Sequence, residues 1–361
     1  MSQHPPERPH EPSGRAYAAA GVDLAARRAF AERLPELLAR TRGPGVLADA
    51  GPFSGLFRVP VAGFREPVLA ASADGIGTKV KLNAAAGRLD LCGADIVGHS
   101  VNDILTCGAK PLFFLDYIAG NGLTNEQKTA LVRGVADACA AVGCALLGGE
   151  TADMPDVYPP GEFDLAGFIV GIVERDRIID GRSIAPGDVL IGLPSSGLHT
   201  NGYSLARRVL GLAVGEPLEE TRRRLAERPP ELGGETLGDA LLRPHRAYLA
   251  DLDPVLDRVK GIAHITGGGF PENLRRILPE GVTASIDTRA WEPLPIFRLI
   301  QARGRIVAEE MYEVFNMGIG MVIAVAPEDA DPVAAALPEG AVIGRIEPWR
   351  GRPVELANLT P

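Results

Sequence analysis

Apolar runs of strand length alternate with segments of helical period along the chain, and this alternation restricts the fold more than any other feature. Residues 111–119 form a continuous apolar run, which is typical of a strand covered on both faces. Residues 94–111 instead place apolar side chains at helical spacing and end in a glycine and proline stop pattern. The strand-like runs 188–194 and 318–326 repeat this organisation later in the chain. The alternation predicts an α/β (or α+β) fold.

The length of the chain predicts more than one domain. Its 361 residues exceed the roughly 250–300 residues that one hydrophobic core organises. Turn-rich sequence before residue 188 indicates a boundary near residue 178, which divides the chain into domains at 16–177 and 178–361. Residues 1–15 are polar and rich in proline, and we expect them to be a disordered tail.

Charge and composition argue against several classes of protein. The net charge of −9 argues against a nucleic-acid partner, because binding to a phosphate backbone needs a basic surface. No apolar run reaches the roughly 18 residues of a membrane span, so we expect no membrane partner and a cytoplasmic location. The four cysteines contain no C-x-x-C pair, which is typical of buried thiols rather than of disulfides or a zinc ribbon.

The segment 74–79, Asp-Gly-Ile-Gly-Thr-Lys, is a candidate phosphate-binding turn. Neither common glycine-rich nucleotide motif occurs here in its strand–loop–helix setting, so a nucleotide must bind in another way. Gly75 and Gly77 let the backbone approach an anion, and the N–H groups with the Lys79 amine suit phosphate oxygens. An ordinary turn is the alternative interpretation.

Three carboxylates are candidate ligands for Mg²⁺. Asp74 opens the turn, Asp103 follows Asn102 on a helix otherwise built for a core, and Glu150 ends an apolar strand. Mg²⁺ prefers a few hard oxygens beside phosphates, which these side chains offer. Each has a simpler alternative as a solvent-facing or capping residue, so the hypothesis depends on the three lying together.

Two glycine-bearing loops in the second half are candidate anion sites. Residues 195–202 (SSGLHTNG) and Gly267–Gly269 each precede a helix, and Pro271 is expected at the first position of the second helix. His199 in the first loop is a candidate phosphate donor or proton carrier. A structural role is the commoner fate of a lone histidine, and we interpret His99 and His264 in that way.

Eight segments, in order and with matching spacing over residues 17–345, closely resemble the phosphoribosylformylglycinamidine cyclo-ligase (aminoimidazole ribonucleotide synthetase) family. They are GVDL, ADGIGTK, VNDILTCGAKPLFFLDY, LLGGETADMP, DLAGFIVGIVE, GDVLIGLPSSGLHTNGYSL, IAHITGGGFPENL and EEMYEVFNMGIGM. The resemblance implies a homodimer of two-domain subunits whose N-terminal domains bind ATP and pair their sheets into a barrel. The implied enzyme is a C–N-bond-forming ligase of purine biosynthesis.

The implied reaction converts formylglycinamidine ribonucleotide and ATP into aminoimidazole ribonucleotide, ADP and phosphate. The resemblance carries site residues over by motif. ATP with Mg²⁺ is expected at Asp74, Gly75, Gly77, Thr78, Lys79, Asn102, Asp103 and Glu150, and the substrate at His199, Asn201, Gly267, Gly268 and Gly269. Lys79, Asp103 and His199 are the expected catalytic residues, and Asp74, Asp103 and Glu150 the expected metal ligands.

One departure from the family pattern leaves alternatives open. The family lysine that follows the tyrosine near the N-terminus is Ala18 here, so a nucleotide contact by that lysine does not transfer. A related phosphotransferase such as thiamine-phosphate kinase or selenophosphate synthetase is one alternative, although no cysteine precedes Cys92 as the latter would need. A nucleotide-binding scaffold without activity is the other.

Overall fold

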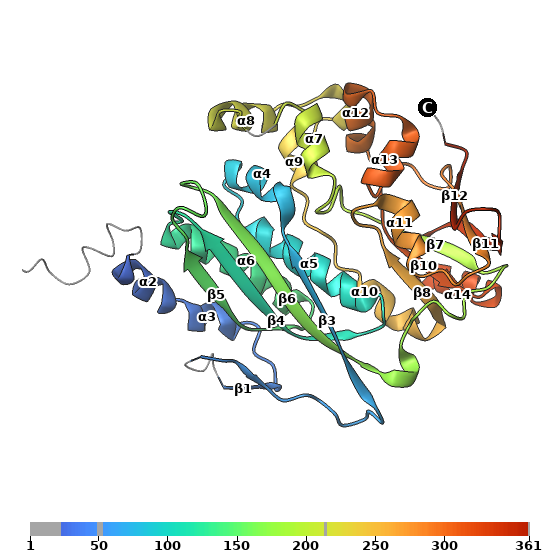
Figure 1. The fold of residues 1–361 in the computed structure, drawn as a ribbon, viewed down its shortest axis with the longest axis horizontal. Helices are drawn as coiled ribbons and strands as arrows, with labels where there is room; N and C mark the ends of the chain where they lie inside the picture. Colours follow the sequence, from blue (N-terminus) through green and yellow to red (C-terminus); the bar gives the residue numbers. More distant parts are fainter. Residues whose placement is uncertain (1–22, 49–52, 213–214, 360–361) are drawn as a thin grey trace, which may run out of the picture.

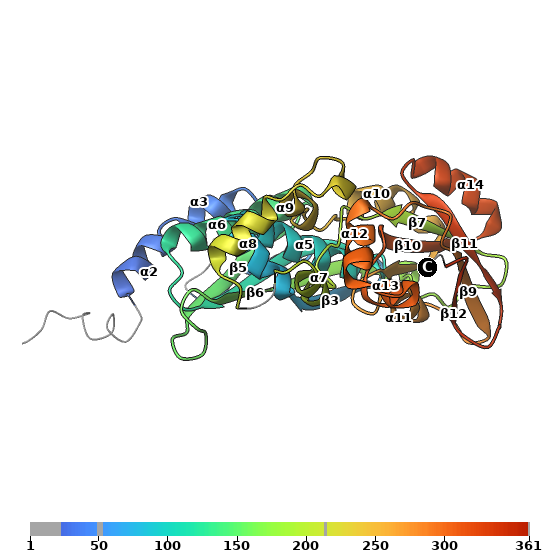
Figure 2. The same cartoon turned by 90° about the horizontal axis from the view of Figure 1, so that it is seen from above.

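The computed structural model describes residues 23–48, 53–212 and 215–359. The predicted tail and Ala18 lie outside these residues. Within them the chain forms one four-stranded sheet, one six-stranded sheet and a small two-stranded ribbon. The two larger sheets belong to successive parts of the sequence and lie end to end along the long axis of the molecule (Figure 2).

The four-stranded sheet has the order β3-β6-β4-β5. Only the β4–β5 pair is parallel, and the other neighbours are antiparallel. Two long helices, α5 and α6, pack on one face of this sheet (Figure 1). The bounds are β3 (Pro67–Gly75), β4 (Lys110–Gly120), β5 (Ala145–Asp153), β6 (Phe163–Glu174), α5 (Asp90–Leu105) and α6 (Asn125–Ala141).

Sequence rules account for both helices. α6 begins at the predicted capping box, in which Thr124 and Gln127 bind each other's backbone N–H groups. α5 buries its predicted apolar positions, including Ile96, Val101 and Ile104, against the sheet. The helices meet at glycines: a Cβ on Gly134 would lie 2.0 Å from the carbonyl oxygen of Asp90.

Shorter elements surround this sheet. Phe57 in β2 packs against Phe113 with ring centroids 5.4 Å apart, so the ribbon covers part of the face away from α5. The N-terminal helices lie against α6. The bounds are α2 (Leu24–Ala31), α3 (Leu34–Ala39), β1 (Val46–Ala48), β2 (Leu56–Phe57) and α4 (Val80–Ala85).

The six-stranded sheet has the order β12-β9-β11-β7-β10-β8, and only β12 and β9 are parallel. Its strands are β7 (Val189–Pro194), β8 (Val259–His264), β9 (Val282–Asp287), β10 (Ile319–Val325), β11 (Ala341–Pro348) and β12 (Val354–Ala357). The accompanying helices are α7 (Tyr203–Val209), α8 (Leu218–Leu225), α9 (Leu237–Leu241), α10 (Leu249–Leu252), α11 (Gly269–Arg275), α12 (Pro295–Gly304), α13 (Ala308–Val314) and α14 (Pro327–Ala336).

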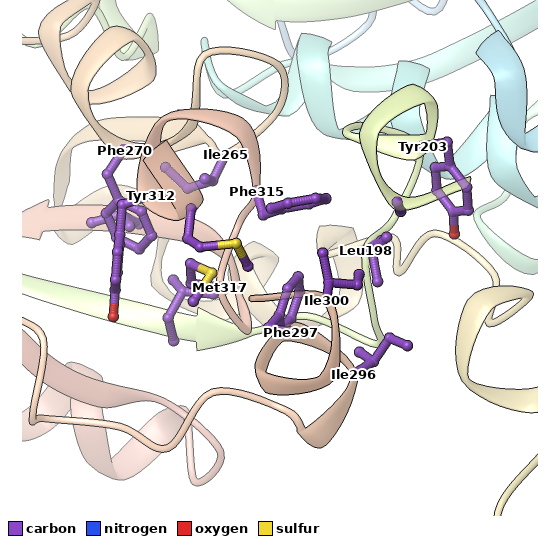
Figure 3. Packing of buried hydrophobic residues seen from close by; sticks show 14 of the residues in the cluster. Leu198, Tyr203, Ile265, Phe270, Ile296, Phe297, Ile300, Tyr312, Phe315 and Met317 are labelled. Carbon is purple, nitrogen blue, oxygen red and sulfur yellow. The ribbon is translucent and has the colours of Figure 1, made fainter. Parts of the chain in front are cut away.

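Strand β10 is buried along its whole length because both faces of this sheet are covered. Val322 and Ala324 belong to the core beneath α7, α11 and α12, whereas Ile323 and Val325 belong to the core on the α14 side. Figure 3 shows the first core, where Leu198 and Ile265 pack among aromatic side chains. The loops that follow these two residues are therefore fixed by buried neighbours.

Two other expectations from the sequence concern the cysteines and membrane-spanning helices. Cys92, Cys139 and Cys144 are buried, Cys107 is half-buried, and all four are free thiols. Within the described ranges, none of the helices combines the length and apolar character of a transmembrane span. The boundary near residue 178 stays a prediction.

The helix crossing gives a first test. Gly134→Ala would ordinarily favour a helix, but its Cβ would overlap the Asp90 carbonyl, so we expect a loss of about 1–3 kcal/mol in the free energy of unfolding. Gly43→Ala, where nothing lies within 4 Å of the new Cβ, is the control. Urea unfolding measures both, and equal stabilities would contradict this packing.

Candidate active site between the two domains

One face of α5 binds the second domain through polar side chains. The backbone N–H of His245 donates to Asp95 Oδ1 at 2.9 Å. Asn102 donates to the carbonyl oxygen of Arg246 at 2.8 Å and accepts from the N–H of Tyr248 at 2.9 Å. Gly98 permits this approach, because a Cβ there would lie 2.4 Å from the His245 carbonyl oxygen. The segment 243–248 is thus attached directly to α5.

A buried ion pair lies beneath this contact. Lys79 and Asp95 are both fully buried and their charged atoms are 2.7 Å apart. Lys79 also donates to the carbonyl oxygen of Arg243 at 2.6 Å, and Asn83 donates to the second oxygen of Asp95. Burial raises the pKa of Asp95 despite these partners. The pair links the turn after β3 to both α5 and the second domain.

Two carboxylate–histidine pairs occupy the outer end of the same interface. His99 Nε2 is 2.6 Å from Asp74 Oδ2, and His264 Nδ1 is 2.9 Å from Asp103 Oδ1. Burial would raise the pKa of each carboxyl, but their histidine partners outweigh it and both pKa values are lowered. Burial opposes the charged form of His99, yet its acidic neighbours raise its pKa. Asp74 and Asp103 therefore remain ionised.

Thr200 connects these pairs to a third histidine. Its hydroxyl is 2.8 Å from His99 Nδ1 and 3.2 Å from His245 Nδ1. His245 Nε2 in turn lies 3.0 Å from His264 Nε2. Burial is the main cause that lowers the pKa values of His245 and His264. The result is a continuous polar network from Asp74 to Asp103 through both domains.

The predicted glycine segments meet at this network. A Cβ on Gly77 would lie 3.7 Å from the Thr200 carbonyl oxygen, and one on Gly267 would lie 3.3 Å from Asn201 Oδ1. Thr78 Oγ1 is 3.3 Å from Ser204 Oγ. The sequence predicts Pro271 at the first position of this helix. α11 instead starts at Gly269, so Pro271 is its third residue. The structure thus brings together three loops that are far apart in the chain.

A cleft of about 340 Å³ opens beside these loops. Asp103 and His264 line it together with Thr266, Asn273 and Arg276. Asn273 donates to the carbonyl oxygens of Gly267 and Gly269, which holds the triple-glycine loop in shape. The cleft therefore combines a carboxylate with an exposed guanidinium, and Asn273 in its wall holds the neighbouring glycine loop. An arginine beside such a loop suits a phosphorylated ligand.

The structure does not bring Glu150 to the other two carboxylates. Asp74 is on β3 and Glu150 on β5, and these strands form opposite edges of the sheet with β6 and β4 between them. Three inter-strand spacings amount to about 14 Å, so the side chains cannot share one ion within this chain. Glu150 instead lines a separate cavity of about 630 Å³ beneath α2 and α3. Within one chain, therefore, only Asp74 and Asp103 of the three predicted carboxylates lie at this interface.

Two expected nucleotide contacts have other partners. Lys79 is fully buried in its ion pair, so it cannot reach a phosphate without separating from Asp95. Asn102 is also fully buried, and both ends of its amide bind the 246–248 backbone. In this structure each side chain holds the domains together, and the direct ATP contacts of Lys79 and Asn102 stay predictions.

His199 lies inside the interface rather than on its surface. It is fully buried with φ of 62°, stacks on His245 at a centroid distance of 4.0 Å, and accepts from the Ser196 N–H through Nε2. Its Nδ1 has no hydrogen-bond partner among the described residues. Burial lowers its pKa well below the usual value, so the ring is neutral. The ring of His199 therefore has no exposed surface in this structure.

Sequence reasoning missed the roles of His99, His264 and Asp95. Asp95, His99 and Asp103 are spaced four residues apart on α5, which does predict one shared face. The signal for His264 is its place three residues before the triple-glycine loop. Its pairing with Asp103 depends on the contact between the domains, whereas His99 and Asp74 pair within the first domain.

Comparison with known proteins supports the two-domain architecture. The family models for the AIR synthase related protein match residues 61–173 with the N-terminal domain and 185–353 with the C-terminal domain. The crystal structure of thiamine-monophosphate kinase from Stenotrophomonas maltophilia K279a superposes with a TM-score of 0.63 at 19% identity, covering 91% of this chain and 96% of that one. The chain therefore belongs to the two-domain AIR synthase related proteins.

Closer relatives define the group within this family. A phosphoribosylformylglycinamidine cyclo-ligase of Myxococcus xanthus is 49% identical, covering 94% of this chain and 97% of the relative. One of Symbiobacterium thermophilum is 50% identical, covering 90% and 92%. The chain belongs to the phosphoribosylformylglycinamidine cyclo-ligase family, a family of ligases. The predicted family and enzyme class are confirmed.

The buried pair makes a testable prediction. Asp95→Asn leaves Lys79 charged and unpaired in the interior, so we expect a loss of about 3–5 kcal/mol in the free energy of unfolding. Lys79→Met in the same chain removes that charge, and the double variant should lose less than the two single variants together. Asp137→Asn, which breaks an exposed pair with Arg40, is the control. Additive losses in urea unfolding would contradict the pairing.

Proposed function

We propose that the cleft between the domains converts formylglycinamidine ribonucleotide and ATP into aminoimidazole ribonucleotide, ADP and phosphate. The observation that supports this most is the convergence of Asp74, Asp103 and three glycine-bearing loops at one interface. The close relatives bear the name of this activity over more than nine-tenths of their length. The fold neighbour at 19% identity supports the architecture alone, so a kinase activity has no comparable support.

The chemistry requires orientation and charge neutralisation more than a protein nucleophile. Transfer of the γ-phosphoryl group to the formyl oxygen makes that oxygen a leaving group. The amidine-derived nitrogen then attacks the carbon, the ring closes, and phosphate departs. Holding the two reactants in line supplies much of the acceleration. Loops fixed by buried residues, such as Leu198 and Ile265, suit this task (Figure 3).

The donor set fits a divalent ion with the nucleotide. Asp74 and Asp103 are ionised, and their side chains are 37% and 29% exposed, so both carboxylates reach solvent; Asp103 also lines the cleft. When bound there, Mg²⁺ would neutralise charge on the phosphoryl oxygens. Gly75, Gly77 and Thr78 offer the turn beside it. Within one chain, Glu150 lies on the far edge of the sheet, and Lys79 and Asn102 bind protein groups instead of the ion.

The loops of the second domain form the proposed substrate side. Asn201 and Gly267 approach each other within the second domain, and Arg276 supplies positive charge to the cleft beside the triple-glycine loop. Gly268 and Gly269 continue this loop. A ribonucleotide carries one phosphate, which suits an arginine and a glycine loop. His199 acts here by supporting Thr200, since its own ring is fully buried. We also propose a cytoplasmic location, where purine biosynthesis takes place.

Substrate-dependent ADP release tests the reaction. We expect ADP to form only when ATP and formylglycinamidine ribonucleotide are both present, in a coupled assay. Asp74→Asn should lower kcat/KM by about 100-fold or more, because one ligand charge beside the phosphates is lost. Asp137→Asn, on the exposed side of α6, should match the wild type. Equal ADP release without the second substrate would exclude the proposed reaction.

We propose further that the chain is a homodimer in which two four-stranded sheets close into a barrel. The face of the sheet away from α5 and α6 exposes Leu69, Tyr117 and Phe168, with exposed fractions of 56%, 43% and 41%. Apolar side chains grouped on a strand face in this way favour a covering partner. A second copy would bury this face and pair the edge strands β3 and β5.

A charge on that face tests the dimer. Phe168→Glu should shift the sedimentation coefficient from that of a dimer to that of a monomer, because the carboxylate would be buried without a partner. Val342→Glu, on an exposed position of β11 in the other domain, should leave the dimer intact. A monomeric wild type, or a dimeric Phe168→Glu variant, would contradict the barrel.

A further inference from the structure

Two cations lie close together across the boundary between the domains. The 3₁₀ turn Gly77–Lys79 runs directly into α4, so Thr78 and Lys81 are about one helical turn apart on one face. On α7, Ser204 and Arg207 have the same spacing. The Oγ atoms of Thr78 and Ser204 are 3.3 Å apart, so these two faces lie against each other (Figure 1). Lys81 and Arg207 therefore occupy neighbouring positions, one from each domain.

Arg207 is a buried cation without a counter-ion among the described residues. Only 6% of it is exposed, and its Nε donates to the carbonyl oxygen of Leu212 at 3.0 Å. Within the described part of the chain, no carboxylate pairs with this guanidinium, and its two terminal nitrogens make no hydrogen bond. Both of these nitrogens keep some contact with solvent, so a ligand can reach them. Burial of a charge is unfavourable unless an opposite charge offsets it, so an anion from outside the chain would stabilise this side chain.

The partner of Lys81 is one that a stronger anion can replace. Its amine contacts the carboxylate of Glu162, which lies just before β6, and the two side chains are 36% and 37% exposed. Burial and the charge of Arg207 lower the pKa of Lys81. Ion pairs as exposed as this one contribute little to stability. An anion with more charge than a carboxylate can therefore displace Glu162 and bind between the two cations.

Two cations and two hydroxyls in one place suit a phosphate group. Guanidinium and ammonium groups form charge-assisted hydrogen bonds to phosphate oxygens, and hydroxyls add neutral donors. We propose that this boundary holds a phosphate-binding site built by both domains, from Thr78, Lys81, Ser204 and Arg207. The site is separate from the cleft beside the triple-glycine loop. It adjoins the turn where the proposed function places ATP, and it rests on that function for the identity of the ligand. It supplies there the positive charge that Lys79, buried in its ion pair, does not.

Inorganic phosphate, added to the full chain, is the first probe. We expect saturable binding in isothermal titration calorimetry, and a midpoint of thermal unfolding that rises with the phosphate concentration. Arg207→Met removes the charge and keeps an unbranched side chain, so it should weaken phosphate binding by about tenfold or more. Lys81→Gln should weaken it by about threefold, because the lysine is more exposed and its charge is better screened.

Glu162→Gln should have the opposite effect. It removes the carboxylate that competes for Lys81, so phosphate should bind about threefold more tightly. A general loss of structure cannot produce such a gain. Arg208→Gln removes the same charge from an exposed position next to Arg207 on α7, and this control should bind phosphate as the wild type does.

The stability of Arg207→Met separates a binding role from a structural one. Since no carboxylate of the described residues pairs with Arg207, its replacement should leave the midpoint of urea unfolding unchanged or higher in phosphate-free buffer. Added phosphate should then stabilise the wild type but not this variant. A lower midpoint with unchanged phosphate affinity would show that Arg207 only supports the fold.

Two further titrations identify the source of the phosphate group. MgATP carries the group in a triphosphate, whereas ribose 5-phosphate carries it as the ribonucleotide does. Weaker binding of MgATP alone in Arg207→Met assigns the site to ATP, and weaker binding of ribose 5-phosphate alone assigns it to the ribonucleotide. Either loss supports the site.

The proposal is overturned if the wild type does not bind phosphate, or if Arg207→Met and Lys81→Gln both bind it as the wild type does. If circular dichroism shows that Arg207→Met does not fold, Lys81→Gln and Glu162→Gln carry the test with their opposite signs. Substrate-dependent ADP release from a protein whose phosphate affinity ignores these substitutions rejects this inference and leaves the proposed reaction intact. Phosphate binding that responds to them, in a protein that releases no ADP, does the reverse.

Discussion

The attachment of one backbone segment to one helix face determines the rest of the site. α5 belongs to the layer of helices on one face of the first sheet (Figure 1). Its Asp95 and Asn102 nevertheless bind the backbone at residues 243–248 through their side chains. This contact brings His245 and His264 to the carboxylates of the first domain. Without this contact Asp103 would be separated from His264 and Arg276. The cleft needs residues of both domains, so it would not form.

Local patterns predicted the elements well because they depend on neighbours in the chain. The capping box at Thr124, the buried positions of α5 and the shared face of Asp95, His99 and Asp103 all follow from helical spacing. The convergence of the glycine turn with the loops at 195–202 and 267–269 was expected only from a resemblance to a family. The positions of these three segments in the sequence do not show how far apart they lie in the folded protein.

The failures have a common physical cause. The sequence groups Glu150 with Asp74 and Asp103 because each is a carboxylate in or after an apolar segment, but the order of strands in a sheet is a non-local property. The sequence favours a phosphate as the partner of Lys79, because nothing near Lys79 in the chain shows that Asp95 lies within 2.7 Å. A structural role is the simplest interpretation of His99 and His264, since burial and a role at a carboxylate give the same local pattern.

The position of segment 243–248 also affects how the protein is made. The first sheet and its helices are complete at residue 174, some seventy residues before this segment leaves the ribosome. Until then Lys79 and Asp95 have only each other and Asn83, and the amide of Asn102 remains in water. In the N-terminal half of a nascent chain these polar groups therefore remain hydrated. They are buried only when residues 243–248 of the second domain pack against α5.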